Sequence, residues 1–289
     1  MATSLKVLVT GATGKQGGAV ARRLRENNHH VRALTRTPDS PAAAELARLG
    51  VEMAQGDLTD RASLDRALQG MDSVFLMATP FEAGTGAETV QGVTMADAAK
   101  AAGTFLVYSS VGDADRNTGI PHFDSKYAVE KHIRAIGADA TIIAPVYFMD
   151  NVVYIRDQLR NNVYPSALSP DRGVYQIAVS DVAAVAVTVL ENKARYAGKR
   201  YDIGVEEVSP SQTVRILSEV TGRPFVHFQL PTEMVRQTMG EDGVKMNEYF
   251  EQVGYHVDRA ELEREFPNVR WTSFETWARN FDWTTFLGT

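Results

Sequence analysis

Along the first half of the chain, two patterns of apolar and polar residues follow one another in turn, as expected when short strands alternate with helices. Nearly continuous apolar runs are separated by longer stretches in which apolar residues recur every three or four positions. The first pattern is typical of strands buried on both faces of a parallel sheet, and the second of amphipathic helices. The predicted strands are Lys6–Thr10, Val31–Thr35, Val51–Gln55, Ser73–Ala78, Thr104–Ser109 and Thr141–Ala144. The predicted helices between them are Gln16–Asn27, Ala42–Leu49, Arg61–Leu68, Ala87–Ala102 and Phe123–Ile136.

This order of elements predicts an α/β protein of the Rossmann type. Its doubly wound parallel sheet is joined by right-handed crossovers, and such sheets bind ligands at the carboxyl ends of their strands. After Pro145 the loops lengthen and amphipathic helices outnumber strands. We therefore predict a main domain in residues 1–150 and a smaller, mostly helical C-terminal domain in residues 151–175 and 205–289. Residues 176–204 are expected to return to the main domain through a helix and a late strand.

The returning helix is predicted at Asp181–Leu190 and the late strand at Arg200–Ile203. Helices of the smaller domain are predicted near 231–239, 244–254 and 273–281. Ser209 and Gln212 have the spacing of a capping box at a helix start, and Thr272 and Glu275 have the same spacing. Residues 237–245 hold two glycines among acidic residues and are a candidate mobile lid.

A glycine-rich turn follows the first predicted strand. The apolar run ends in Thr10-Gly11-Ala12-Thr13-Gly14-Lys15-Gln16-Gly17, and a helix is predicted directly after it. A strand that enters a helix through such a turn leaves backbone N–H groups and the positive end of the helix dipole free to bind an anion, usually a pyrophosphate. The predicted contacts of a dinucleotide in this turn are Gly11, Thr13, Gly14, Lys15, Gln16 and Gly17.

The end of the second strand favours NADP(H) over NAD(H). An NAD enzyme usually has an acidic residue there that binds the ribose hydroxyls, whereas this chain has Thr35 and then Arg36. A guanidinium can bind a 2′-phosphate through two hydrogen bonds, and Lys15 is a second candidate cation for the same phosphate. The alternatives are that both cations are solvated surface residues, or that Asp39 supplies the missing acid.

Further cofactor contacts are predicted after the third and fourth strands. Asp57, followed by Leu58, is placed to accept a hydrogen bond from the adenine amino group, and an Asx turn is its alternative role. Thr79 lies where the chain is expected to pass beneath the central part of the cofactor.

Composition narrows the class of protein. A chain of 289 residues is long enough for a main domain and a smaller one. Its residues are 44% apolar, which is enough for a full core, and 23% charged. A net charge of −6 argues against general nucleic-acid binding, and the lack of cysteine excludes disulfides and thiolate-ligated zinc. We predict no metal site. With no apolar run of about 18 residues and no export signal, a cytoplasmic protein without membrane association is expected.

The helix predicted at Phe123–Ile136 carries the candidate catalytic residues. Tyr127 and Lys131 match the Tyr-x-x-x-Lys spacing of short-chain dehydrogenases. At about 100° per residue, however, both point away from the apolar face of this helix, whereas His122 and Lys126 point toward it. We therefore expect His122 and Lys126 to face the cofactor, and the literal motif to lie on the surface.

The motifs together resemble the NmrA-like family of atypical short-chain dehydrogenases. The resemblance rests on the glycine turn, on His122-Phe123-Asp124-Ser125-Lys126, and on Pro145-Val146-Tyr147-Phe148-Met149-Asp150-Asn151. It implies a two-domain NADP-binding protein, and the family includes both regulators without turnover and reductases of quinones, triphenylmethane dyes and other electrophiles. It also implies that Lys126 holds the nicotinamide ribose and that Tyr147 and Phe148 lie beside the nicotinamide. Ala144 departs from the arginine common at that position.

The resulting hypothesis is an NADPH-dependent oxidoreductase that reduces a small, planar, electrophilic molecule such as a quinone, enone, imine or dye by direct hydride transfer. Lys126 fixes the cofactor, and His122 or Tyr147 handles a proton; a histidine bonded to backbone at the helix start is the alternative for His122. The expected substrate pocket consists of Phe81, His122, Tyr147 and Met149. The alternative function is a non-catalytic sensor of NADP(H), and both a monomer and a homodimer are compatible with the sequence.

Overall fold

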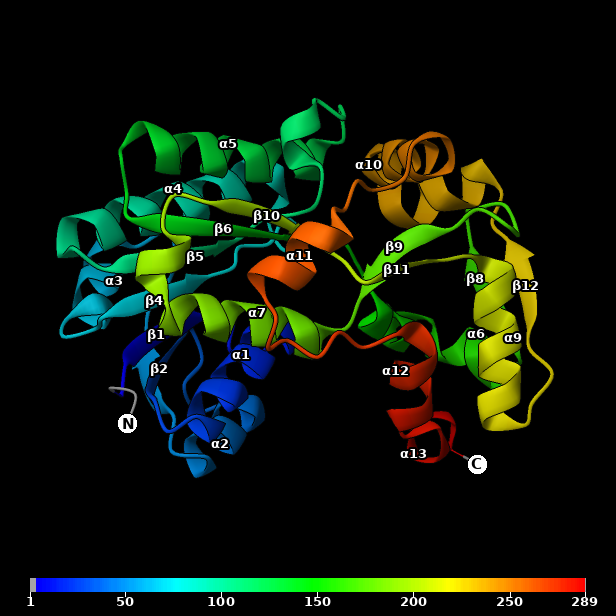
Figure 1. The fold of residues 1–289 in the computed structure, drawn as a ribbon, viewed down its shortest axis with the longest axis horizontal. Helices are drawn as coiled ribbons and strands as arrows, with labels where there is room; N and C mark the ends of the chain where they lie inside the picture. The colour runs from blue at the N-terminus through cyan, green and yellow to red at the C-terminus, as the bar shows by residue number, and fades with distance from the viewer. Residues whose placement is uncertain (1–3, 289) are drawn as a thin grey trace.

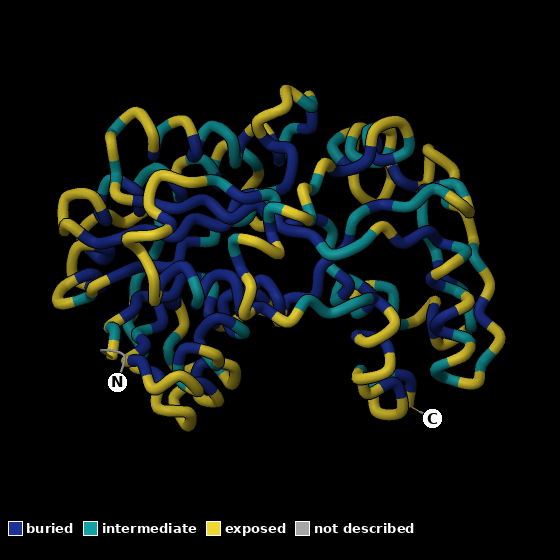
Figure 2. The backbone as a smooth tube through the Cα atoms, viewed as in Figure 1, coloured by how far each residue is buried: buried dark blue, intermediate teal, exposed yellow. Residues whose placement is uncertain are grey.

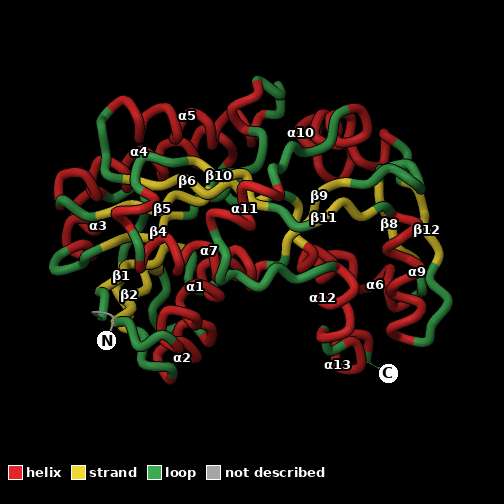
Figure 3. The backbone as a smooth tube through the Cα atoms, in the orientation of Figure 1, coloured by secondary structure: helices red, strands yellow, loops and turns green. Residues whose placement is uncertain are grey.

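The computed structural model describes residues 4–288. Residues 1–3 and 289, which the predicted domain bounds include, lie outside this range. A seven-stranded sheet has the order β10-β6-β5-β4-β1-β2-β3, and all of its neighbouring strands are parallel (Figures 1 and 3). Its strands are β1 (Lys6–Thr10), β2 (His30–Thr35), β3 (Glu52–Gln55), β4 (Ser73–Leu76), β5 (Phe105–Ser109), β6 (Ala140–Pro145) and β10 (Arg200–Ile203). The direction of winding reverses between β1 and β4, which is where such sheets bind ligands.

Helices cover both faces of this sheet (Figure 1). One face is covered by α1 (Lys15–Glu26), α2 (Pro41–Arg48) and α7 (Val179–Glu191), and the other by α3 (Arg61–Leu68), α4 (Gly84–Ala102) and α5 (Pro121–Ala135). The sheet is therefore buried on both sides, and Figure 2 shows that the buried backbone concentrates along its strands. This arrangement confirms the predicted Rossmann-type fold class. The return of the chain through α7 and β10 places β10 beside β6.

Beyond the main sheet, part of residues 147–288 forms a second region with two small sheets and a separate core. Its strands are β7 (Tyr147–Phe148), β9 (Val174–Ile177) and β11 (Glu206–Val208) in one sheet, and β8 (Val163–Ser166) and β12 (Val226–Gln229) in the other. Its larger helices are α9 (Pro210–Thr221) and α10 (Thr232–Gln252). The short helices α6 (Arg156–Arg160), α12 (Phe274–Asn280) and α13 (Trp283–Leu287) lie on the side of α9, away from α10 (Figure 1). The remaining helices of residues 4–288 are short: α8 (Lys193–Tyr196), α11 (Arg259–Glu265), η1 (Ala114–Arg116) and η2 (Met149–Ile155). No helix among residues 4–288 is both long and apolar enough to cross a membrane.

Local predictions in the second region had mixed outcomes. The capping box of Ser209 and Gln212 is present at the start of α9. The box predicted for Thr272 is wrong, because Ser273 caps α12 and Thr272 instead donates to Asp181. The candidate lid at 237–245 is helical, since it lies within α10, which kinks at Gly240 where φ is 68°.

A close approach of α4 to α5 depends on one glycine. A Cβ atom added at Gly92 would lie 2.5 Å from Cγ2 of Val129, closer than two carbon atoms can pack. Glu88 and Ser125 lie one turn before these two residues on the same faces of their helices. The missing side chain at Gly92 therefore brings the polar groups of α4 and α5 within hydrogen-bonding distance.

We expect Gly92→Ala to destabilise the protein by about 1–3 kcal/mol, because overpacking outweighs the better helix propensity of alanine, which is worth about 1 kcal/mol. The same substitution in a Val129→Ala background is expected to cost less, since the clashing methyl groups are gone. Urea unfolding of the four proteins of this double-mutant cycle measures the coupling. Effects that add to within about 0.5 kcal/mol would contradict the close contact.

Candidate functional site

The glycine turn between β1 and α1 has the geometry of an anion site. Gly11 has a φ of 61°, and its carbonyl accepts a hydrogen bond from the Gly14 N–H at 3.0 Å. A Cβ atom at Gly17 would lie 2.5 Å from the Gly11 carbonyl, so α1 packs directly on the turn. Gly14 is the N-cap of α1, no side chain caps the helix, and its first turn contains no acidic residue. The free N–H groups at this helix start fit the diphosphate of a dinucleotide.

Two predicted contacts in this turn point elsewhere. Gln16 is buried, and its Nε2 donates to the Ser109 hydroxyl at 2.9 Å, so its side chain is committed inside the protein. The Lys15 ammonium lies 3.2 Å from the carbonyl oxygen of Asp150 and 4.0 Å from the ring centroid of Tyr154. Burial lowers the pKa of Lys15, against an opposite effect of Asp150. Lys15 is thus turned toward the second region, and its cooperation with Arg36 stays a prediction.

Hydrogen bonds join the glycine turn to the end of β4. The Thr10 hydroxyl donates to the Met77 carbonyl and accepts from the Met77 N–H, both at 2.9 Å. The next residue, Ala78, accepts a hydrogen bond from the Lys126 ammonium at 3.1 Å. The Lys126 ammonium and the glycine turn therefore lie at the same edge of the sheet, at the point between β1 and β4 where the winding reverses.

Lys126 forms an ion pair with a buried carboxylate that the sequence analysis missed. Its Nζ lies 2.6 Å from Oε1 of Glu88, which has no exposed surface. The other oxygen of Glu88 accepts a hydrogen bond from the Ser125 hydroxyl at 2.5 Å. Glu88 therefore holds two consecutive residues of α5. One signal in the sequence could have identified Glu88. It lies four residues before Gly92, on a helix face that is otherwise rich in small residues and therefore suited to close packing.

The helical register expected for α5 is confirmed. Lys126 reaches the sheet edge, whereas Lys131 is exposed and lies 5.1 Å from the ring centroid of Tyr127. Tyr127 and Lys131, which match the Tyr-x-x-x-Lys spacing, therefore lie away from the glycine turn.

His122 faces a carboxylate of the second region. Its Nδ1 lies 2.8 Å from both carboxylate oxygens of Asp242, on α10. The His122 side chain is 13% exposed, and that of Asp242 is 32% exposed. The ring is thus bonded to a side chain, in contrast to the alternative of a backbone bond. Nothing in the sequence around Asp242 identifies it as the partner.

The residues predicted around the adenosine lie at the ends of β2, β3 and β4. Arg36 pairs with Glu82 at 2.7 Å, and both side chains are more than half exposed. Asp57 forms an Asx turn, in which Oδ1 accepts from the Thr59 N–H and hydroxyl. The Thr59 hydroxyl contributes most to lowering the pKa of Asp57. Thr79 accepts a hydrogen bond from the Phe81 N–H, and its contact with a cofactor stays a prediction.

The predicted substrate pocket is brought together only in part. Tyr147 and Phe148 form β7 and are partly buried against the main core. Burial raises the pKa of Tyr147, against a hydrogen bond to Asn151. The prediction for Met149 is wrong, because this apolar side chain is buried in the core of the second region. Phe81 is 87% exposed on the β4–α4 connection and therefore does not line an enclosed pocket.

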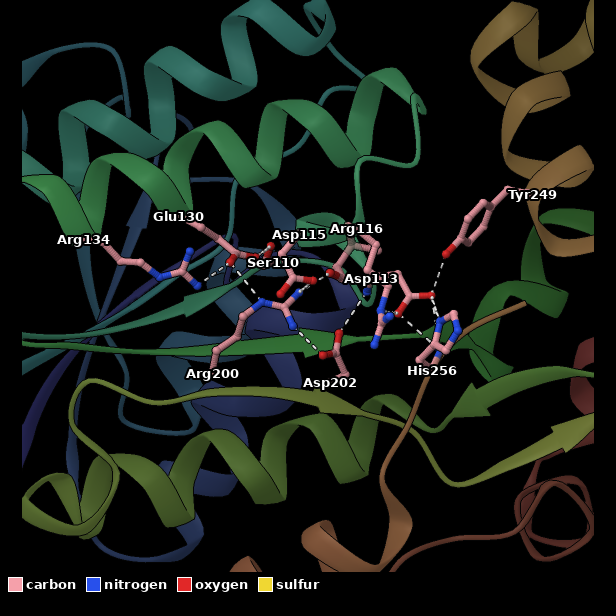
Figure 4. A network of polar contacts seen from close by, with 11 residues as sticks. Ser110, Asp113, Asp115, Arg116, Glu130, Arg134, Arg200, Asp202, Tyr249 and His256 are labelled. Carbon is pink, nitrogen blue, oxygen red and sulfur yellow. Dashed lines mark hydrogen bonds and ion pairs between the residues drawn. The ribbon is translucent and has the colours of Figure 1, made fainter. Parts of the chain in front are cut away.

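A charged network lies beside the end of β5 and along β10 (Figure 4). The Ser110 hydroxyl donates to Glu130 at 2.6 Å, and Glu130 accepts from Arg200 Nε at 3.0 Å. Arg200 also pairs with Asp202. Burial raises the pKa of Asp202, against the opposite effect of Arg200. Ser110 is therefore committed to a structural carboxylate.

The same network fixes the chain after α10 to the main sheet. Asp113 is fully buried in a left-handed conformation, and its N–H donates to Asp202 at 2.9 Å. Its carboxylate accepts hydrogen bonds from the Tyr249 hydroxyl at 2.9 Å and from the His256 N–H at 3.2 Å, and it lies 3.0 Å from His256 Nδ1 (Figure 4). These contacts hold both ends of the segment from Tyr249 to His256 against the edge of the seven-stranded sheet.

Two surface hollows lie apart from these residues. One, of about 360 Å³, is lined by Asp171, Gly173, Glu207, Ser209, Ser211 and Gln212. The other, of about 320 Å³, lies beside β3 and α3. Neither contains a predicted site residue, so the candidate site is defined by the glycine turn and by the side chains around it.

Comparisons with known proteins identify the family of this chain. The model of the NmrA-like family matches residues 3–278. A (4-alkanoyl-5-oxo-2,5-dihydrofuran-3-yl)methyl phosphate reductase of Streptomyces griseus is 34% identical over 239 residues, covering 81% of this chain and 80% of that protein. An NAD(P)H azoreductase of Xenophilus azovorans is 30% identical over 237 residues, with 81% and 80% covered.

A solved structure gives the same fold. Triphenylmethane reductase of Citrobacter sp., crystallised with NADP(H), matches with a TM-score of 0.80 at 22% identity, over 95% of this chain and 99% of that one. At this identity the likeness concerns the fold alone.

We expect Glu88→Ala to lower the free energy of unfolding by about 3 kcal/mol, because it leaves the largely buried Lys126 ammonium without its carboxylate. Glu45→Ala, which breaks the exposed ion pair with Arg22, is the control and is expected to cost about 1 kcal/mol or less. Urea unfolding of both variants checks this. Equal losses in the two variants would refute a special role of Glu88.

Proposed function

This chain belongs to the NmrA-like family, and from that premise we propose that it is an NADP(H)-dependent reductase of small, planar, electrophilic organic molecules. The observation that carries the proposal is the meeting of the uncapped start of α1 with the Lys126 ammonium at one edge of the sheet. The helix start suits a diphosphate, and the ammonium suits the hydroxyl groups of a ribose beside it.

The residues at this edge fit the cofactor. The backbone of residues 11–17 would hold the diphosphate, and Arg36 would bind the 2′-phosphate. Glu82 must then release Arg36, which costs little because exposed ion pairs are worth about 1 kcal/mol or less. In Asp57, Oδ1 is occupied by Thr59, while Oδ2 accepts no hydrogen bond from residues 4–288 and is available to the adenine amino group.

When bound, NADPH supplies a hydride, and the protein has to orient the acceptor and deliver a proton where the acceptor needs one. Lys126 is held by Glu88 and Ala78, so it is a fixed positive charge beside the reacting groups. Two side chains are candidates for the proton. Because burial raises the pKa of Tyr147, its phenol is a weaker acid than an exposed tyrosine, and we therefore assign the proton to His122.

Two relatives support the substrate class. One is named as a reductase of an oxo-dihydrofuran compound and the other as an azoreductase. A ring conjugated to a carbonyl and an azo bond are both electron-poor double bonds that accept a hydride. The partly buried Tyr147 and Phe148 would offer aromatic surface to a flat molecule of this kind.

We expect the purified protein to oxidise NADPH in the presence of at least one member of a panel of quinones, enones, imines, azo compounds and cationic dyes. Lys126→Ala should lower kcat/KM about 100-fold, because it removes a fixed charge at the reacting centre. Lys131→Ala, on the exposed side of the same helix, is the matched control and should leave the rate unchanged. The fall of the nicotinamide absorbance measures both. Tight NADPH binding without oxidation by any acceptor would instead favour the cofactor-sensing alternative.

Arg36→Ala should weaken NADPH binding about tenfold or more and leave NADH binding nearly unchanged, since only NADPH carries the 2′-phosphate. Isothermal titration calorimetry of both cofactors measures the two affinities. Arg22→Ala removes a surface cation from α1 and serves as the control. Equal weakening of both cofactors would place Arg36 away from the 2′-phosphate, and no binding of either cofactor would overturn the proposed function.

A further inference from the structure

His122 and Asp242 are brought together from the two regions of the molecule. His122 lies in the first turn of α5 and Asp242 lies on α10, 120 residues later. The Nδ1 atom of the ring is 2.8 Å from each carboxylate oxygen. A histidine that donates from Nδ1 to a carboxylate has a fixed ring orientation, and Nε2 is the nitrogen left for another partner.

The backbone explains why Asp242 reaches this position. Gly240 interrupts α10 with a φ of 68° and a ψ of −169°, so a new helical segment starts directly before Asp242. On the other side, the N-cap residue of α5 is Ile120, which has no side-chain acceptor. The Asp242 carboxylate also lies 3.4 Å from the His122 backbone N–H, within hydrogen-bonding distance. One carboxylate therefore accepts from the start of α5 and from its first polar side chain.

We propose that Asp242 is a positioning residue for proton delivery by His122. The inference rests on the proposed function, because it concerns the proton that accompanies hydride transfer. His122 precedes Lys126 by one helical turn and lies on the same face of α5, so its ring is near the group that marks the cofactor edge. The Asp242 carboxylate holds the ring through Nδ1 and balances its positive charge when both nitrogens carry protons. Nε2–H is then the proton donor toward the acceptor.

The step balances for an acceptor with an electron-poor double bond or with conjugated carbonyl groups, as in a quinone. One end of this bond or conjugated system takes the hydride as a new C–H, N–H or O–H bond, and the π electron pair moves to the other end. That end takes the proton from Nε2, so the acceptor is reduced by two electrons and His122 becomes neutral. Solvent can return the proton, because both side chains retain some exposed surface. A cationic triphenylmethane dye gains only a hydride and becomes neutral, so it needs no proton.

Comparing an acceptor that needs a proton with one that does not distinguishes a positioning role of Asp242 from helix capping alone. Asparagine and aspartate are about equally good caps, so Asp242→Asn keeps the acceptor at the start of α5 and removes only the charge. We expect the variant to reduce a quinone or azo compound about 100-fold more slowly, and a cationic triphenylmethane dye within about threefold of the wild-type rate. Glu241→Gln, which changes a neighbouring exposed acid paired with Arg236, should leave both rates unchanged. Equal loss with both acceptors, or no loss with either, would overturn the proposal.

A second measurement needs neither cofactor nor turnover. Nitrogen-15 NMR of the ligand-free protein at alkaline pH, with His122 assigned from the spectrum of His122→Gln, reports which ring nitrogen carries the proton. We expect Nδ1–H in the wild type and Nε2–H, the form that free histidine prefers, in Asp242→Ala. A wild-type ring protonated at Nε2 would refute the proposal. If none of the acceptors in the panel is reduced by NADPH, the proposed function fails. The NMR experiment still decides whether Asp242 holds the ring of His122.

Discussion

The close contact between α4 and α5 is the constraint on which the candidate site depends. Gly92 allows Val129 to pack against the backbone of α4, and one turn earlier this contact brings Glu88 to Ser125 and Lys126. A carboxylate without exposed surface is costly unless it is paired and hydrogen-bonded. Here both of its oxygens have partners, so the cost of burying it is offset only while the two helices stay together. The position of the Lys126 ammonium is therefore set by the packing of Gly92 against Val129, one helical turn away.

The cations around this edge differ in how firmly their partners hold them. Lys126 is paired with a fully buried acid, whereas Arg36 is paired with an exposed one. Since exposed ion pairs contribute little, Arg36 can exchange Glu82 for a phosphate at small cost, while Lys126 keeps its place. This difference suits their proposed roles, because a phosphate must be captured from solvent, whereas a group beside the reacting atoms has to be fixed before the ligand arrives.

Much of the seven-stranded sheet and its helices could be predicted because their signals are local. Buried strands have continuous apolar runs, the glycine turn follows the first of them, and helical periodicity placed Lys126 inward and Lys131 outward. The five strands of the second region were missed because they span only two to four residues each and do not alternate regularly with helices, as the equally short β3 and β4 do. Asp242 could not be identified either. It stands beside Glu241 in an acidic helix, and only the tertiary fold decides which of the two meets His122.

The contacts that join the two regions also explain the motif at residues 145–151. Asp150 accepts a hydrogen bond from the Val179 N–H at the start of α7, and its carbonyl accepts one from Lys15. The motif thus fixes the direction in which the chain leaves the sheet. Asp113 fixes the far end of α10 through Tyr249 and His256, and Asp242 fixes α10 near its kink. Three separate attachments therefore hold the second region against the sheet edge, and one of them places Asp242 beside His122.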